Sequence, residues 1–401
     1  MNILWVTSER VDPQSGGIAR VTYLLAEGLA GKGITSYSTY LRRNDGIQSP
    51  SKVFEQEILI DGEDHVCQYS NILTLYKIDF VIVQGGYSEM NKELMCLRES
   101  INLQARSIPL YLVFHSMPGY ELYFLDWPIL IRKIFSKEWK EYCKQFILQT
   151  IMLMNKKLLQ KQLYQKYRIP YQIADKVILL SSSYIEDFNS LARGKDKSKY
   201  VSIPNMLTFP IIEDEGLSAS KKKEVLIVAR MDERSKRIKL ALQIWGKMPI
   251  RLLDEGWILT IIGNGEDLAY YQNYVKSNGI KGILFEGCKD PRPYYQEASV
   301  FMMTSSYEGW PMTLTEAMQN GCVPIVFDSF KAVYDIVNSG KNGIIVTNND
   351  LNTYIRELVR LMDEDEYRNK LAQNALIDSK RFEKEHVINL WVELLNNDKH
   401  H

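Results

Sequence analysis

Two glutamates eight positions apart, Glu308 and Glu316, enclose a Gly-Trp-Pro sequence and are followed by an Ala-Met pair. Pro311 suits the first turn of a helix, where its missing N–H is no loss, and Gly321 is placed to end that helix. The pattern therefore predicts Glu308 in a loop that enters a helix, and Glu316 about two turns along it. Carboxylates at these positions can each accept hydrogen bonds from sugar hydroxyl groups. The structural alternative is an exposed loop acid and a charge near the start of the helix.

The predicted helix start is also suited to an anion. The N–H groups of Met312, Thr313 and Leu314 lie at its positive end, where backbone donors lack partners within the helix. A phosphate bound there would lie beside the loop glutamate.

A basic loop offers the complementary charge. Arg230 follows a strand predicted at residues 224–229, and Lys236 lies six residues on, before a helix predicted at 238–247. Fixed cations at a strand end can neutralise the charge that grows on a departing diphosphate. Charge-assisted hydrogen bonds of this kind contribute about 1.5–3 kcal/mol each. The alternative for Lys236 is membership of the solvated basic run at 234–239.

Three further strand ends carry residues of interest. Gly16 and Gly17 follow the first predicted strand, and Gly263 lies in a Gly-Asn-Gly turn after a later one. Glycine lets the backbone approach a ligand closely, although such a loop can also simply require positive φ. His115 ends a strand that reads as buried, where a lone histidine is more often a satisfied core residue than part of a site.

Strands that alternate with helices must position these residues. In the first half we predict strands at 3–7, 36–41, 79–84, 110–115, 176–180 and 200–203, and in the second half at 224–229, 257–262, 282–285, 299–303, 323–327 and 343–346. Alternation of this kind is typical of parallel sheets flanked by helices, so the fold class is α/β with two doubly wound Rossmann-like domains. Ligands of such sheets bind beyond the carboxyl ends of the strands. Two such edges that face one another would form an inter-domain cleft.

The predicted boundaries follow the composition. Residues 1–207 form the first domain and residues 208–381 the second, with a charged linker of small residues at 210–223 between them. The C-terminal stretch 382–401 is an amphipathic helix that we interpret as a packing helix and that can cross back onto the first domain.

The segment from Glu308 to Glu316 resembles the E-x7-E signature of retaining glycosyltransferases with the GT-B fold, especially family four. Four other segments resemble that family's elements in the same order: the glycine loop at 16–17, Ile-Pro-Asn at 203–205, Val-Ala-Arg-Met-Asp-Glu-Arg-Ser-Lys at 228–236 and Gly-Asn-Gly at 263–265. The family's usual glycine after the lysine is replaced here by Arg237.

The resemblance implies a role for each residue. Glu308 would bind the transferred hexose and support its charge, and His115 would contact the sugar near the reacting carbon. Arg230 and Lys236 would hold the diphosphate. The implied donor-binding residues are Gly16, Gly17, Gly263, Met312, Thr313, Leu314 and Glu316, with Glu316 on the ribose hydroxyls. Retention would proceed by front-face attack without a covalent enzyme intermediate.

Composition excludes several other classes. Lysine plus arginine and aspartate plus glutamate each number 49, so the formal net charge is zero, which argues against a general nucleic-acid binder. The five cysteines are scattered and form no C-x-x-C pair, which argues against a disulfide framework and indicates a reducing compartment. The N-terminus does not read as a signal peptide, and no apolar run reaches the ~20 residues of a membrane span. We expect a cytoplasmic protein, peripheral at the inner face of the plasma membrane if it meets lipid.

A basic aromatic stretch at 120–170 bears on that last point. It holds ten basic and four acidic residues, a local net charge of +6, and ten aromatic residues, among them Trp127 and Trp139. This composition fits a surface that meets anionic lipid headgroups, and equally a solvated helix pair with its aromatics in the core.

The sequence thus predicts a retaining, metal-independent hexosyltransferase that needs no cofactor beyond its nucleotide-sugar co-substrate. The donor is expected to be a UDP-sugar, and the acceptor a saccharide or lipid-linked saccharide in surface polysaccharide biosynthesis. The metal-independent reading rests on the lack of a D-x-D pair at a strand end. One alternative is a catalytically silent sugar-nucleotide or glycan-binding subunit of an assembly complex. Another, an NAD-dependent oxidoreductase, is disfavoured because the loop after Thr7 lacks G-x-G-x-x-G.

Overall fold

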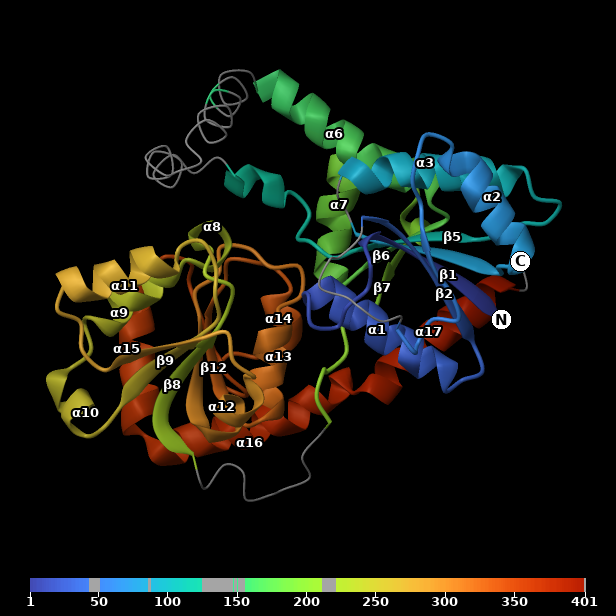
Figure 1. Cartoon of the computed structure of the whole chain (residues 1–401). Coiled ribbons are helices and arrows are strands. Elements are labelled where there is room, and N and C mark those ends of the chain that lie inside the picture. Colours follow the sequence, from blue (N-terminus) through green and yellow to red (C-terminus); the bar gives the residue numbers. More distant parts are fainter. Residues whose placement is uncertain are drawn as a thin grey trace. The chain divides into compact units, whose positions relative to one another are not determined.

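The computed structural model describes residues 1–42, 51–85, 88–124, 147, 150, 156–210 and 221–399. The chain divides into two compact units (Figure 1). The first unit comprises Met1–Gly119, Met152–Thr208 and Lys384–His401, and the second comprises Tyr120–Ile151 and Phe209–Glu383. Most of the predicted linker at 210–223 lies outside the described residues.

The first unit is built on a seven-stranded parallel sheet in the order β3-β2-β1-β4-β5-β6-β7. Its strands are β1 (Asn2–Glu9), β2 (Thr35–Arg42), β3 (Glu57–Leu59), β4 (Phe80–Gln84), β5 (Leu110–Phe114), β6 (Lys176–Leu179) and β7 (Tyr200–Ser202). Its helices are α1 (Gly17–Ala30), α2 (His65–Leu75), α3 (Ser88–Asn102), α6 (Lys156–Ile173), α7 (Ile185–Ala192) and α17 (Lys384–Lys399), with 3₁₀ turns η2 (Ser182–Tyr184) and η3 (Lys197–Lys199). The strand order reverses direction between β1 and β4, which is where open α/β sheets bind ligands.

The second unit has a six-stranded parallel sheet in the order β10-β9-β8-β11-β12-β13. Its strands are β8 (Lys222–Val228), β9 (Ile258–Ile262), β10 (Ile283–Gly287), β11 (Ala298–Met303), β12 (Val323–Phe327) and β13 (Ile344–Val346). Its helices are α8 (Glu233–Lys236), α9 (Ile238–Trp245), α10 (Ile250–Asp254), α11 (Leu268–Ser277), α12 (Arg292–Glu297), α13 (Met312–Gln319), α14 (Val333–Ile336), α15 (Leu351–Asp363) and α16 (Asp365–Ser379), with 3₁₀ turns η1 (Tyr120–Phe124) and η4 (Lys380–Phe382). The equivalent reversal falls between β8 and β11.

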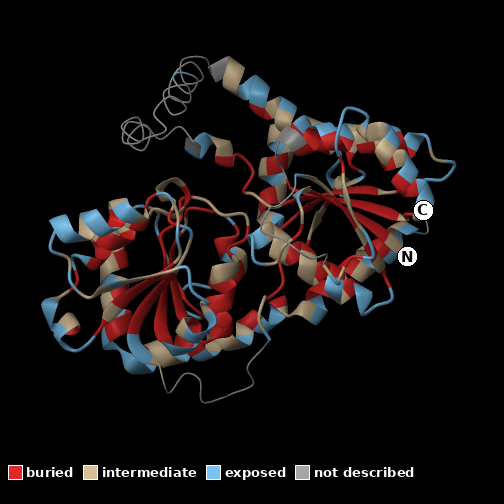
Figure 2. Cartoon of the chain, in the orientation of Figure 1, coloured by how far each residue is buried: buried red, intermediate tan, exposed pale blue. Residues whose placement is uncertain are grey.

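Burial explains why these segments form strands. β4, β5, β11 and β12 are buried along their whole length, as expected for parallel strands covered by helices on both faces (Figure 2). Every predicted strand is confirmed within a few residues. The sequence analysis missed β3, whose three residues are only partly buried at the sheet edge.

The C-terminal helix α17 returns to the first unit, as the expected crossing back required. It lies beside α1 in Figure 1, and Trp391 packs its ring 6.3 Å from that of Trp5. Lys32 of the segment after α1 donates to Glu385 over 2.5 Å. The helix therefore completes the first unit's core.

No helix among the described residues combines the length and apolarity needed to cross a bilayer. Trp127 and Trp139 of the basic aromatic stretch lie outside the described residues.

Candidate active site

The polar residues predicted for the second unit gather where β8 and β11 end. The loop after β8 carries Arg230 and Lys236, and the segment after β11 leads through Glu308 to α13. A cavity of about 10 Å³ lies between these segments and is lined by both Lys236 and Thr313. It has room for about one water molecule. The sheet thus brings the two predicted motifs together at its switch point.

Lys236 and Glu308 form an ion pair. Lys236 Nζ donates to Glu308 Oε1 over 2.5 Å, and the two side chains are 23% and 12% exposed. A pair this shielded from water is screened much less than a surface pair. The lysine side chain is therefore paired and largely shielded, which the members of a solvated run would not be.

Arg230 is the accessible cation of the loop. Its side chain is 71% exposed, and its Nη2 donates to Asp232 Oδ2 over 3.2 Å. An exposed guanidinium held by one long contact can turn to an incoming anion at small cost.

The start of α13 differs in part from the expectation of three open donors. The Leu314 N–H donates to the Pro311 carbonyl over 3.0 Å, so this donor is already engaged. No hydrogen bond among the described residues takes up the N–H groups of Met312 and Thr313. These two N–H groups are the ones that can meet an anion at this helix start.

Glu316 is buried inside the unit. Its side chain lies on α13 with 2% of the residue exposed, and its Oε2 accepts from the Tyr295 hydroxyl over 3.0 Å. Asn320 donates to its carbonyl over 2.8 Å. The residue is thus tied into the packing between α12 and α13.

The Gly-Asn-Gly turn supports the basic loop by close backbone contact. Gly263 has φ of +138°, and a Cβ added there would lie 1.9 Å from the Ala229 carbonyl oxygen. The Met231 N–H donates to the Asn264 carbonyl over 2.9 Å. Only glycine allows the turn and the loop to lie this close together.

Arg237 is a residue that the sequence analysis did not assign to the site. It has φ of 49°, in the left-handed region where the family resemblance has glycine, and it ends α8. Its guanidinium donates to the carbonyls of Thr304 and Ser305, the two residues that follow β11. The departure from the family pattern was the available signal.

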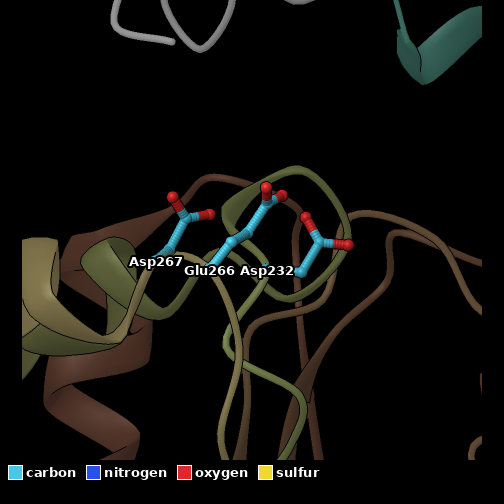
Figure 3. A group of neighbouring side chains, drawn as sticks. All are labelled: Asp232, Glu266 and Asp267. Carbon is cyan, nitrogen blue, oxygen red and sulfur yellow. The ribbon is translucent and has the colours of Figure 1, made fainter. Parts of the chain in front are cut away.

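Three carboxylates, Asp232, Glu266 and Asp267, lie beside the same loop (Figure 3). Their oxygen atoms come within 4.8 Å of one another. Asp232 caps α8 by accepting from the Arg234 N–H over 3.1 Å, and Asp267 accepts from the Glu233 N–H over 2.8 Å. The two aspartates therefore help to hold the conformation of the loop. Asp232 and Asp267 are 35 positions apart, so no local sequence pattern predicted that they would lie together.

In the first unit, Gly16 and Gly17 lie where β1 passes into α1. Gly16 precedes the helix, and a Cβ added to it would meet no atom within 4 Å. The backbone here therefore borders open space, as a ligand-binding loop requires.

His115 follows β5 and is held by its neighbour on β4. Its Nε2 lies 2.5 Å from Gln84 Oε1, and it lines a cavity of about 10 Å³ together with Asn205 and Trp391. Burial lowers the pKa of His115 to about 4, because the surroundings disfavour the charged ring. The imidazole is therefore neutral at physiological pH.

With this geometry in place, comparison with known proteins is informative. Residues 209–377 match the family model Glycosyl transferases group 1. The match spans the site-bearing unit from just before β8 to near the end of α16.

Curated relatives cover more of the chain at low identity. The amylovoran biosynthesis glycosyltransferase AmsD of Erwinia amylovora is 26% identical over 232 residues, 56% of this chain and 63% of its own. A Campylobacter jejuni N-acetyl-D-galactosaminyltransferase, named for an undecaprenol-diphosphate-linked glycan, is 24% identical over 231 residues, 57% of this chain and 62% of its own. The matched part is less than two thirds of either relative's length.

Solved structures cover the whole chain. Anabaena Alr3699/HepE in complex with UDP superposes with a TM-score of 0.74 at 15% identity, over 99% of this chain and 100% of that one. The chain has the GT-B fold, with two Rossmann-like halves that each carry a parallel sheet.

Proposed function

We propose that the protein is a retaining glycosyltransferase that moves a hexose or N-acetylhexosamine from a UDP-sugar to a saccharide or lipid-linked saccharide in surface glycan biosynthesis. The observation that carries the proposal is the shielded Lys236–Glu308 pair beside the start of α13. A cation, a carboxylate and the N–H groups of a helix start within one strand-end site can bind a sugar diphosphate. The group 1 family match over this unit supports the same chemistry.

In this proposal Lys236 and Arg230 neutralise the diphosphate as the bond to the sugar breaks. The N–H groups of Met312 and Thr313 donate hydrogen bonds to the diphosphate oxygens and so help to stabilise the same charge. Glu308 positions Lys236 in the unliganded chain and binds the hexose when the donor arrives. We assign His115 to the sugar and Glu316 to the ribose, as the family resemblance implies.

The choice of UDP is supported by solved neighbours that contain it. The choice of a glycan acceptor is supported by the printed names of the curated relatives. We also propose catalysis without a metal; Asp232 and Asp267 each already accept a hydrogen bond from an N–H group of the loop, which supports a structural role for them. Contact of residues 120–170 with an anionic membrane stays a prediction, which flotation with phosphatidylglycerol vesicles tests.

The test is sugar transfer by the full chain from a panel of UDP-, GDP- and ADP-sugars to short glycan acceptors. We expect release of UDP and an α-configured product from an α-linked donor, read by NMR, with no loss of activity in EDTA. Lys236→Met and Arg230→Ala should each lower turnover at least tenfold, since each removes a charge-assisted contact to the diphosphate. Arg251→Ala, which removes a surface arginine paired with Asp363, is the matched control.

The outcomes separate the parts of the proposal. UDP that stabilises the chain without any transfer would indicate the silent binding subunit instead. Inversion of the anomeric centre would refute retention, and activity lost in EDTA and restored by Mg²⁺ would refute the metal-independent step.

A further inference from the structure

The Arg237 side chain joins loops that follow three strands of the second sheet. Its Nε donates to the Thr304 carbonyl over 2.6 Å and its Nη2 to the Ser305 carbonyl over 2.8 Å. Its Nη1 and Nη2 also donate to the side-chain oxygens of Asn349 and Asn348, each over 2.9 Å. One guanidinium thus links the loops after β8, β11 and β13.

The surroundings of this cation are mostly neutral. The hydrogen-bond acceptors found for it among the described residues are two carbonyls and two amides, and its Cζ lies 5.5 Å from the centre of the Phe327 ring at the end of β12. Burial lowers the pKa of Arg237 to about 10, in spite of the nearby Glu233. A partly buried cation costs free energy unless its donors are satisfied, and four acceptors satisfy the donors of Arg237.

The loops that Arg237 joins are those that hold the catalytic ion pair. Arg237 directly follows Lys236, and Thr304 Oγ1 donates back to the carbonyl of Lys236 over 3.0 Å. The Ser306 N–H then donates to the Ser235 carbonyl over 2.7 Å. Glu308 lies two residues beyond Ser306. The segments that carry the two partners of the ion pair are therefore joined by a short series of bonds, and the Arg237 side chain contributes two of them.

We propose that Arg237 is a positioning residue that sets the Lys236–Glu308 pair for sugar-diphosphate chemistry. The inference rests on the proposed function, because it gives the pair a catalytic purpose. Arg237 itself touches no reacting atom. It acts by holding the segment after β11 against the loop after β8.

The left-handed backbone at Arg237 supplies an unusually clean test. Arg237→Gly removes the guanidinium and at the same time favours the native φ of 49°. Arg237→Ala removes the same group but keeps the backbone cost, so the pair separates side chain from backbone. Arg237→Lys keeps the charge with fewer donors in a less rigid arrangement. Asn348→Ala removes a single acceptor and serves if the arginine variants fold poorly.

We expect Arg237→Gly to lower kcat for sugar transfer by about tenfold to a hundredfold, since small misplacements of a reacting group cost about that much. The donor KM should stay within about threefold, and Arg237→Lys should recover part of the loss. Amide hydrogen exchange of the peptide that contains Ser306 should become faster in Arg237→Gly, a readout that does not depend on activity.

Four results would overturn the inference. Wild-type kcat in Arg237→Gly, unchanged amide exchange at Ser306, or a loss confined to KM would each show that the Arg237 side chain does not position the ion pair. A loss of activity that matched only the fraction of unfolded chain would show a purely structural role. A wild-type chain that transfers no sugar would instead refute the proposed function. Hydrogen exchange would still report whether Arg237 holds the segment after β11 against the loop after β8.

Discussion

The shielded ion pair of Lys236 and Glu308 predicts a coupling free energy larger than that of a surface pair. The second unit contains a matched comparison, because Lys222 and Glu297 also lie 2.5 Å apart. The two pairs differ in exposure: 23% and 12% for the first, 60% and 48% for the second. Burial is therefore the main variable that separates them.

The expected magnitudes follow from that difference. Exposed pairs contribute about 0.2–1 kcal/mol, because water and salt screen the charges and two long side chains lose freedom. Hydrogen bonds to charged groups contribute about 1.5–3 kcal/mol when they are sheltered. We expect a coupling free energy of about 1.5 kcal/mol for Lys236 with Glu308, and less than about 0.5 kcal/mol for Lys222 with Glu297.

Two double-mutant cycles measure these values in the full chain. One cycle combines Lys236→Met with Glu308→Gln, and the other combines Lys222→Met with Glu297→Gln. All four substitutions remove the charge and nearly keep the volume of the side chain. Urea unfolding followed by circular dichroism gives the four free energies of each cycle, at low and at high salt. Equal coupling in the two cycles, or a value for the first that salt abolishes, would refute the argument from burial.

Three other predictions follow from single contacts. The pKa of His115 is lowered to about 4, so at a pH between 6.5 and 4 this histidine is protonated in the unfolded chain but not in the folded one. The free energy of unfolding should therefore fall by about 1.4 kcal/mol per pH unit in this range. His115→Leu should flatten that slope in urea titrations, and an unchanged slope would refute the assignment. Gly263→Ala should destabilise the chain by at least about 2 kcal/mol through collision with the backbone, whereas Gly279→Ala, which also has positive φ but open space around it, should cost only about 1 kcal/mol. A Cβ on Gly28 would lie 2.4 Å from Ile388 Cδ1, so Gly28→Ala should lower the melting temperature. In an Ile388→Ala background the same change should raise the melting temperature, because only the gain in helix propensity remains. An effect of the same sign in both backgrounds would contradict this packing.

The sequence was sufficient for the sheets because their strands are buried on both faces. A strand such as β5 can be predicted from its own continuous apolar run, and a helix such as α1 from the glycines that bound it. β3 carries no such run, since its three residues lie at an edge and are only partly buried. Lys236 and Glu308 were each predicted to follow a strand, but that these two strands are neighbours at the switch point is known only from the strand order of the sheet.

The contacts that fix the site could not be read in the same way. Arg237 bonds residues about 67 and 111 positions away, and Asp267 reaches back to the N–H of Glu233, 34 positions earlier. Such bonds depend on three-dimensional register and not on a local pattern. The burial of Glu316 belongs to the same class, because its partner Tyr295 lies on a different helix.

The discontinuous first unit has a consequence for how the chain is made. The helix that covers α1, with Trp391 against Trp5, is translated only after all of residues 209–383. At about 5–20 residues per second, roughly 10–35 s pass between the emergence of the segment that ends at Thr208 and that of α17. During this interval the apolar side chains beneath α17 have no cover, while the second unit is still being translated. Nascent chains should therefore depend on chaperones until α17 leaves the ribosome.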